Sequence, residues 1–207
     1  MDKANIEKIF STLNNHIDNP TSELNYNNLF TLLVAVMLSA QATDAGVNKA
    51  TANLFAIINS PQDILNLGEN ALIENIKSIG LYKSKAKHIM QTCSILVNEY
   101  KGEVPNTLEE LIKLPGVGRK TANVVLNVYF KQPTMPVDTH IFRLSHRIGL
   151  SNGKDVLQVE KDLLKIIPKT YLQQAHHLLI LHGRYTCKAK KFDCNTCCIN
   201  QWCEKNF

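Results

Sequence analysis

The sequence predicts an all-α protein, and two observations support that prediction. Apolar residues recur at helical spacing over most of the chain, and no strand–helix–strand alternation is present, which argues against a parallel α/β sheet. Of the 207 residues, 44% are hydrophobic and 20% are charged, so extensive disorder and a collagen-like fibre are excluded. A chain of this length can form one sizeable core or two small lobes.

The first third of the chain contains four predicted helices. The first has apolar residues at helical spacing, namely Ile6, Ile9, Phe10, Leu13 and Ile17. Residues 29–38 are apolar except for one threonine, and because a membrane span needs about 20 apolar residues, they predict a buried core helix. Thr43 can cap a helix that runs to about residue 58, and Ser60 with Pro61 begins the next.

The rest of the chain is predicted to be helical as far as about residue 185. A helix from about residue 82 has one apolar face, formed by Ile89, Cys93, Leu96, Val97 and Tyr100. Thr107 and Asp155 each begin a sequence that resembles a capping box, the second with Asp in place of Ser or Thr. Further helices are predicted at residues 119–130, 139–148, 156–167 and 171–182.

Charge is distributed unevenly along the chain. The net charge is +5, but residues 1–110 contain 8 basic and 12 acidic residues, whereas residues 111–207 contain 15 basic and 6 acidic ones. A basic half is typical of a protein that faces an anion such as nucleic acid, although a solvated basic face explains the same count equally well. The N-terminus shows no apolar segment of the secretory type, so we expect a protein of the reducing cytoplasm.

Five of the six cysteines lie in the last 21 residues, at Cys187, Cys194, Cys197, Cys198 and Cys203. In a reducing compartment such clustering favours a metal site over disulfides. Four of them, leaving out Cys198, are spaced as four thiolate ligands would be, but zinc and iron–sulfur clusters both accept four thiolates. The spacing alone leaves both open. Cys93 fits the apolar face of its helix and is predicted to be a core residue.

Residues 114–122 read Leu-Pro-Gly-Val-Gly-Arg-Lys-Thr-Ala and join two predicted helices. Gly116 and Gly118 allow a tight turn with positive φ, after which backbone N–H groups point outward at the start of the next helix. Glycines alone would indicate an ordinary αα-hairpin. Arg119 and Lys120 beside the turn favour phosphate binding.

This segment resembles the helix–hairpin–helix motif of endonuclease III-like DNA glycosylases. Residues 137–143, Val-Asp-Thr-His-Ile-Phe-Arg, are similar to the segment of that family that carries the catalytic aspartate, and the spaced cysteines are similar to its iron–sulfur loop. Residues 38–44 and 178–187 also resemble family segments. The resemblance covers nearly the whole chain, in order.

The resemblance implies an all-α, two-lobed helix–hairpin–helix glycosylase fold. Residues 22–132 would form a six-helix lobe with the motif at about 107–130. Residues 1–21 with 133–207 would form a helical iron–sulfur lobe, in which residues 187–203 are the cluster loop. Lys120 and Asp138 would face each other at a cleft between the lobes.

The activity implied is base-excision DNA repair by a bifunctional N-glycosylase and apurinic/apyrimidinic-site lyase that removes oxidised pyrimidines. Lys120 would attack the sugar C1′, displace the base and form a Schiff base, and β-elimination would then cut the strand. Free lysine has a pKa of about 10.4, so we expect protein walls and the inserted nucleotide to dehydrate the attacking amine. Asp138 would take a proton or stabilise the positive sugar. It follows Pro136 and precedes a helix, so it also suits an N-cap.

The substrate implied is double-stranded DNA that contains damaged bases or abasic sites, and a base must be flipped out to be reached. The resemblance gives Gln41 the role of facing the orphaned base and Leu81 that of an apolar wedge. The residues alone favour a helix C-cap for Gln41 and a core position for Leu81. Lysines flank Leu81 and predict a phosphate-facing loop: Lys77, Lys83, Lys85 and Lys87. The other expected DNA contacts are Gly116, Gly118, Arg119, Lys190, Lys191 and His140, the last of which could equally be a packed histidine.

The resemblance selects a [4Fe–4S] cluster held by Cys187, Cys194, Cys197 and Cys203, with a structural and DNA-positioning role. Cys198 is not expected to coordinate. We expect a monomer that does not bind membranes and that acts in the cytoplasm at the nucleoid. Two alternatives stay open. One is an adenine-mismatch glycosylase of the same fold, a family that usually lacks lysine at the position of Lys120. The other is a non-catalytic DNA-binding module stabilised by zinc.

Overall fold

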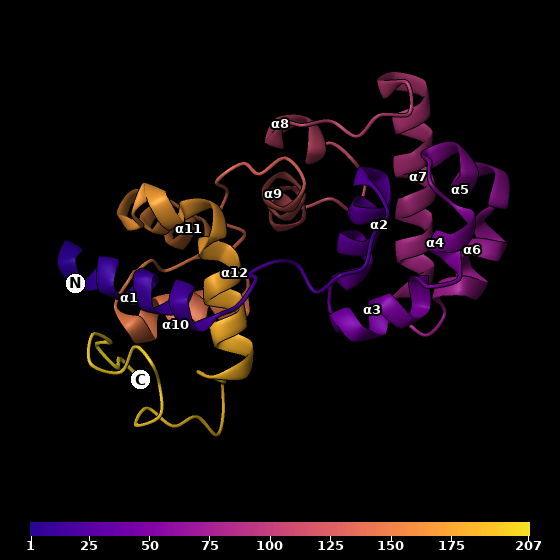
Figure 1. Cartoon of the computed structure of the whole chain (residues 1–207). Coiled ribbons are helices and arrows are strands. Elements are labelled where there is room, and N and C mark those ends of the chain that lie inside the picture. Colours follow the sequence, from indigo (N-terminus) through magenta and orange to yellow (C-terminus); the bar gives the residue numbers. More distant parts are fainter. The chain divides into compact units, whose positions relative to one another are not determined.

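The computed structural model describes all 207 residues and contains twelve α-helices and no β-strand, which confirms the predicted all-α class (Figure 1). The chain divides into two compact units. We call residues 23–130 the continuous unit, and residues 1–22 together with 131–207 the discontinuous unit. No helix in either unit has the length and apolar character needed to cross a bilayer.

The continuous unit is built around α2 (Leu29–Ser39), whose residues 30–38 are all buried. This confirms the predicted core helix, and each fully buried aliphatic side chain stabilises the unit by roughly 1.5–3 kcal/mol. The helix begins where Asn28 and Thr31 cap each other: the Asn28 side chain accepts from the Thr31 N–H, and the Thr31 hydroxyl accepts from the Asn28 N–H. No basic residue lies in its last turn, so its C-terminal carbonyls need a partner from elsewhere.

Seven further helices complete the continuous unit: α3 (Asp44–Thr51), α4 (Leu54–Ile57), α5 (Pro61–Leu67), α6 (Glu69–Ile76), α7 (Tyr82–Tyr100), α8 (Leu108–Leu111) and α9 (Arg119–Val128). The longest, α7, packs against α2, α5 and α6. Ser60 caps α5 and Thr107 caps α8, as their sequences predict. Cys93 of α7 is fully buried, which confirms it as a core residue.

The single helix predicted from residue 43 to about 58 is wrong, because the structure divides it into α3 and α4. Thr51, the last residue of α3, is buried and donates its hydroxyl to the carbonyl of Val47 at 2.9 Å. This local side-chain bond competes for a carbonyl within the helix and favours a bend.

The discontinuous unit contains α1 (Lys3–His16), α10 (Thr139–Ile148), α11 (Val156–Ile166) and α12 (Lys169–Tyr185). Ile9, Phe10 and Leu13 of α1 are fully buried, and α1 packs against α12. The ring of Phe10 stacks on Tyr171 with a centroid distance of 6.2 Å. Beyond α12 the chain has no helix, as the loss of apolar periodicity predicts, and it forms the irregular yellow segment in Figure 1.

Candidate functional site

The turn between α8 and α9 is held in place by two side chains of α7. The Thr92 hydroxyl donates to the carbonyl of Pro115 at 2.9 Å. His88 occupies the space beside Gly116, where a Cβ would lie 2.9 Å from the His88 Cβ. Gly116 also has φ +77°, so this position requires glycine for two independent reasons.

Gly118 differs from the prediction, because its φ is −84° and the turn does not need glycine there. A Cβ at this position would meet nothing within 4 Å. Gly118 is the N-cap of α9 and caps no N–H with a side chain, and the next two residues, Arg119 and Lys120, are exposed. The N-terminal end of α9 therefore presents backbone N–H groups, the positive end of the helix dipole and two cationic residues. This combination suits the binding of an anion.

Gln41 lies in a tight turn at the end of α2. The Ala42 N–H donates to the Ser39 carbonyl at 3.1 Å, Ala40 has φ −57° and ψ 116°, and Gln41 has φ 56°. These angles are those of a type II turn with Gln41 at its third position, where glycine or asparagine is favoured. Gln41 is exposed, and its left-handed backbone costs roughly 1–2 kcal/mol.

Leu81, directly before α7, also has a left-handed backbone, with φ 60° and ψ 25°. It is 63% exposed, so the core interpretation of Leu81 is wrong. Seven residues other than glycine have positive φ, and Leu81 is the one hydrophobic residue among them. A large apolar side chain held outward on a strained backbone indicates a functional constraint.

Lys85 does not belong to a phosphate-facing set, which corrects the prediction. It is 8% exposed, and its ammonium donates to the carbonyls of Leu38 at 2.8 Å and Ala40 at 2.7 Å. Burial lowers the pKa of Lys85. Lys83 and Lys87 on the same helix are exposed. Helical spacing could have separated Lys85 from the others, because it lies four residues before Ile89 on the apolar face predicted for this helix.

Asp138 is the N-cap of α10, as predicted. Its Oδ1 accepts from the N–H groups of His140 and Ile141, both at 2.9 Å. The cap uses one carboxylate oxygen of this half-buried side chain and, by fixing its conformation, also fixes the position of the other oxygen, Oδ2.

His140 is half-buried, and its Nδ1 is buried without a hydrogen-bond partner. It lies close to Gly183 of α12, where a Cβ would come within 3.2 Å of the His140 Cβ. This arrangement supports the packed interpretation of His140.

Four cysteines of the C-terminal segment line one cavity, and they are those expected as ligands: Cys187, Cys194, Cys197 and Cys203. The cavity has about 380 Å³ of space, open solvent included. Cys198 does not line it, and all six cysteines are free thiols. Burial raises the pKa of Cys203, and the neighbouring thiols raise it further, so thiolates gathered here need a cationic group to stabilise them.

Two arginines of α10 hold the start of this segment. Arg143 donates to the carbonyls of Gly183 and Cys187 at 2.9 and 3.0 Å. Arg147 donates to the Cys187 Sγ at 3.4 Å and to the Lys188 carbonyl at 2.8 Å. The Arg147 guanidinium also lies 4.2 Å from the ring centroid of Phe192. The exposed residues Lys190 and Lys191 follow in the loop.

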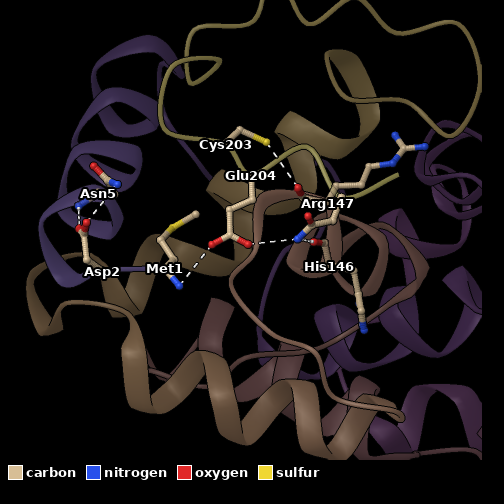
Figure 2. Close-up of polar contacts among 8 residues, drawn as sticks. Met1, Asp2, Asn5, His146, Arg147, Cys203 and Glu204 are labelled. Atoms are coloured by element: carbon tan, nitrogen blue, oxygen red, sulfur yellow. Dashed lines mark hydrogen bonds and ion pairs between the residues drawn. The ribbon is translucent and has the colours of Figure 1, made fainter.

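The end of the segment returns to the C-terminus of α10. The Glu204 N–H donates to the Ile148 carbonyl at 3.1 Å, and the Cys203 Sγ lies 3.5 Å from the Arg147 carbonyl. Figure 2 shows the contact between Cys203 and Arg147. It also shows the Glu204 carboxylate, which pairs with the amino group of Met1 at 3.3 Å. The last cysteine is therefore anchored on the same helix as the first.

Comparisons with known proteins identify the family of this chain. The family described as HhH-GPD superfamily base excision DNA repair protein matches residues 34–169, which places the chain in that class. Endonuclease III of Rickettsia conorii is 56% identical over 202 residues, covering 98% of this chain and 96% of the relative. Endonuclease III of Escherichia coli K12 is 52% identical over 204 residues, covering 99% and 97%.

A solved structure of a trapped endonuclease III–DNA covalent intermediate superposes with a TM-score of 0.93 at 44% identity, covering 100% of this chain and 97% of the other. The chain belongs to the endonuclease III family.

Two side chains that hold the site, His88 and Thr92, escaped the sequence analysis, and a third, Lys85, was given the wrong role. The three lie along one face of α7 at spacings of three and four residues. Lys85 contacts the turn that carries Gln41, whereas His88 and Thr92 contact the turn that precedes Lys120. The spacing was visible in the sequence, but the partners were not.

The two glycines of the turn give a matched pair of stability predictions. Gly116→Ala should lower the free energy of unfolding by about 2–4 kcal/mol, because alanine must adopt positive φ and displace His88. Gly118→Ala should change it by less than about 0.5 kcal/mol. Denaturant unfolding of both variants measures this, and equal losses would contradict the structure.

The Asp138 cap predicts a different pattern. Asp138→Ala should destabilise the protein by about 1 kcal/mol, while Asp138→Asn, which keeps a capping oxygen, should cost only a few tenths. Asp155 caps α11 in the same way and provides a matched control, so Asp155→Ala should also cost about 1 kcal/mol. Unfolding measurements in which Asp138→Asn and Asp138→Ala are equally unstable would argue against the cap.

Proposed function

We propose that this chain is a bifunctional DNA glycosylase and abasic-site lyase of base-excision repair, acting on oxidised pyrimidines in duplex DNA. The observation that carries the proposal is Lys120 in the first turn of an uncapped helix, directly after a tight turn that α7 holds in place. Such a reaction requires an amine nucleophile presented where the DNA backbone is bound, and this helix end combines both.

Lys120 supplies the nucleophile. Its amine forms a bond to the sugar C1′, the bond from C1′ to the base breaks, and the base leaves with the electron pair. The resulting ammonium loses one proton to O4′, and the C1′–O4′ bond breaks as the C1′=N bond of the protonated Schiff base forms. Loss of a C2′ proton then expels the 3′ phosphate. Lys120 is exposed in the free protein, so the bound DNA must exclude water from the amine.

Asp138 acts on the same sugar through Oδ2, because Oδ1 is engaged by the cap. A carboxylate fixed in this way stabilises the positive charge that develops on the sugar as the base leaves, or accepts a proton. Asp138→Asn retains the cap and removes the charge, so a loss of base release in that variant reports on chemistry and not on folding.

Gln41 and Leu81 enter the duplex when the damaged nucleotide is flipped out. Both are exposed and both are held on left-handed backbone. Leu81 fills the gap with an apolar wedge, and Gln41 offers an amide to the orphaned base. Gly118, Arg119, Lys190 and Lys191 bind backbone phosphates.

The four cysteines that line the cavity hold a [4Fe–4S] cluster, which supplies positive charge for four thiolates and a rigid link between chain segments. The donor set fits this group, since the four thiols line one cavity and such clusters are held by four cysteine thiolates. The Arg147 guanidinium beside the Cys187 Sγ stabilises a thiolate at that position. With DNA as the substrate, the protein acts at the nucleoid in the cytoplasm, as a monomer.

Borohydride reduction in the presence of a duplex with one abasic site tests the nucleophile. We expect wild type to form a covalent adduct and Lys120→Ala to form none, with strand cutting reduced by roughly 10³-fold or more. Lys113→Ala, an exposed lysine before the same turn, is the matched control and should form the adduct normally. A wild type without adduct or strand cutting would exclude the lyase and leave the adenine-mismatch or non-catalytic alternative.

Neighbouring cysteines test the ligand set. The purified Cys197→Ser variant should contain less iron and sulfide than wild type, whereas Cys198→Ser should contain as much. Of these two cysteines, Cys197 lines the cavity and Cys198 does not. Metal and acid-labile sulfide analysis with the visible absorption spectrum measures the outcome. Zinc without sulfide in the wild type would overturn the iron–sulfur proposal.

A further inference from the structure

Lys85 makes contacts that the proposed chemistry does not use. Its side chain is buried, and its ammonium bridges two backbone carbonyls, Leu38 at 2.8 Å and Ala40 at 2.7 Å. A buried cation on a surface helix is costly, so its partners are informative. Both are carbonyls at the C-terminal end of α2, which carries no basic residue of its own there.

The Ala40 carbonyl has a particular importance in the turn that follows. Type I and type II turns differ by rotation of their central peptide, which changes the ψ of the second residue and the sign of the φ of the third. In this turn the central peptide joins Ala40 to Gln41, and the oxygen that moves in such a rotation is the Ala40 carbonyl oxygen. Lys85 therefore holds the one atom that decides between the two turn types.

Gln41 would favour the other turn type if it were free to choose. Its φ of 56° is a conformation that glycine and asparagine tolerate and that glutamine rarely adopts. Rotation of the peptide would return Gln41 to negative φ and would redirect its side chain. The ammonium of Lys85 opposes that rotation by a charge-assisted hydrogen bond.

The same residue also ties this turn to Leu81. The Lys85 N–H donates to the Leu81 carbonyl at 3.0 Å, in the first turn of α7. The Lys85 side chain thus contacts the turn that carries Gln41, and the Lys85 backbone contacts Leu81. The proposed function places both Gln41 and Leu81 in the duplex.

We propose that Lys85 is a positioning residue for base extrusion: it locks the Ala40 carbonyl, and thereby fixes the direction in which Gln41 projects beside Leu81. This inference rests on the proposed function, in which Gln41 faces the orphaned base. It assigns Lys85 no contact with DNA.

The test uses single-turnover base release from a duplex with one 5-hydroxyuracil opposite guanine, at saturating enzyme. Lys85→Met retains the length and apolar stem of the side chain and removes the ammonium. We expect a rate about tenfold lower than wild type. Lys87→Met, at an exposed lysine of the same helix, is the matched control and should stay within about twofold.

A double-mutant cycle separates positioning from a general structural role. In the Gln41→Ala background there is no amide to position, so Lys85→Met should change the rate by less than about twofold. An equal tenfold loss in both backgrounds would overturn the inference while leaving the proposed function intact. A wild type that releases no base would instead overturn the proposed function. A Gln41→Ala variant as fast as wild type would overturn the role of Gln41 and, with it, the inference.

A rescue variant provides a second, independent result. Asparagine tolerates left-handed backbone at the third position of a type II turn, so Gln41→Asn should reduce the loss caused by Lys85→Met to about threefold or less. No reduction would contradict the peptide lock. If circular dichroism shows that Lys85→Met is unfolded, Lys85→Gln takes its place in the same cycle, since its side chain is shorter and uncharged, and additivity with Gln41→Ala would again overturn the inference.

Discussion

The buried ammonium of Lys85 binds the C-terminal carbonyls of α2 and so joins the apolar central helix of the continuous unit to its longest helix, α7. α2 is so apolar that it cannot supply a cation for its own negative end, and α7 supplies one from outside. The same face of α7 then reaches the turn before α9, where Thr92 binds a carbonyl and His88 packs against Gly116. One helix thus contacts the turn with Gln41 and the turn before Lys120, and it begins directly after the exposed Leu81.

This arrangement explains why strained residues persist on an exposed surface. A type II turn with glutamine at its third position, and a leucine with φ 60°, are stable only where their surroundings fix them. The discontinuous unit uses a similar device, since the Asp138 side chain caps α10 and is itself immobilised by that cap. Arg143 and Arg147 on the same helix hold the first cysteine of the C-terminal segment. In both units, side chains of a helix hold neighbouring turns or helix ends by short polar contacts to backbone.

The sequence predicts those features that depend on local chemistry. The cap at Asp138, the start of α5 at Ser60, the buried α2 and the glycine requirement at Gly116 follow from residues within a few positions of each other. The role of Lys85 does not, because its carbonyl partners are 45 and 47 residues away in the chain. The sequence wrongly predicts a requirement for glycine at Gly118. The backbone there has an ordinary negative φ, and an added Cβ would meet no other atom within 4 Å.

The most direct measurement of this account is a crystal structure of the Lys85→Met variant at a resolution that places backbone carbonyl oxygens. We predict that the peptide between Ala40 and Gln41 rotates, that the Ala40 oxygen turns away from α7, and that Gln41 returns to negative φ, while the turn at Gly116 is unchanged. An Ala40 carbonyl in its original orientation, with Gln41 still near φ 56°, would contradict the claim that Lys85 holds this turn.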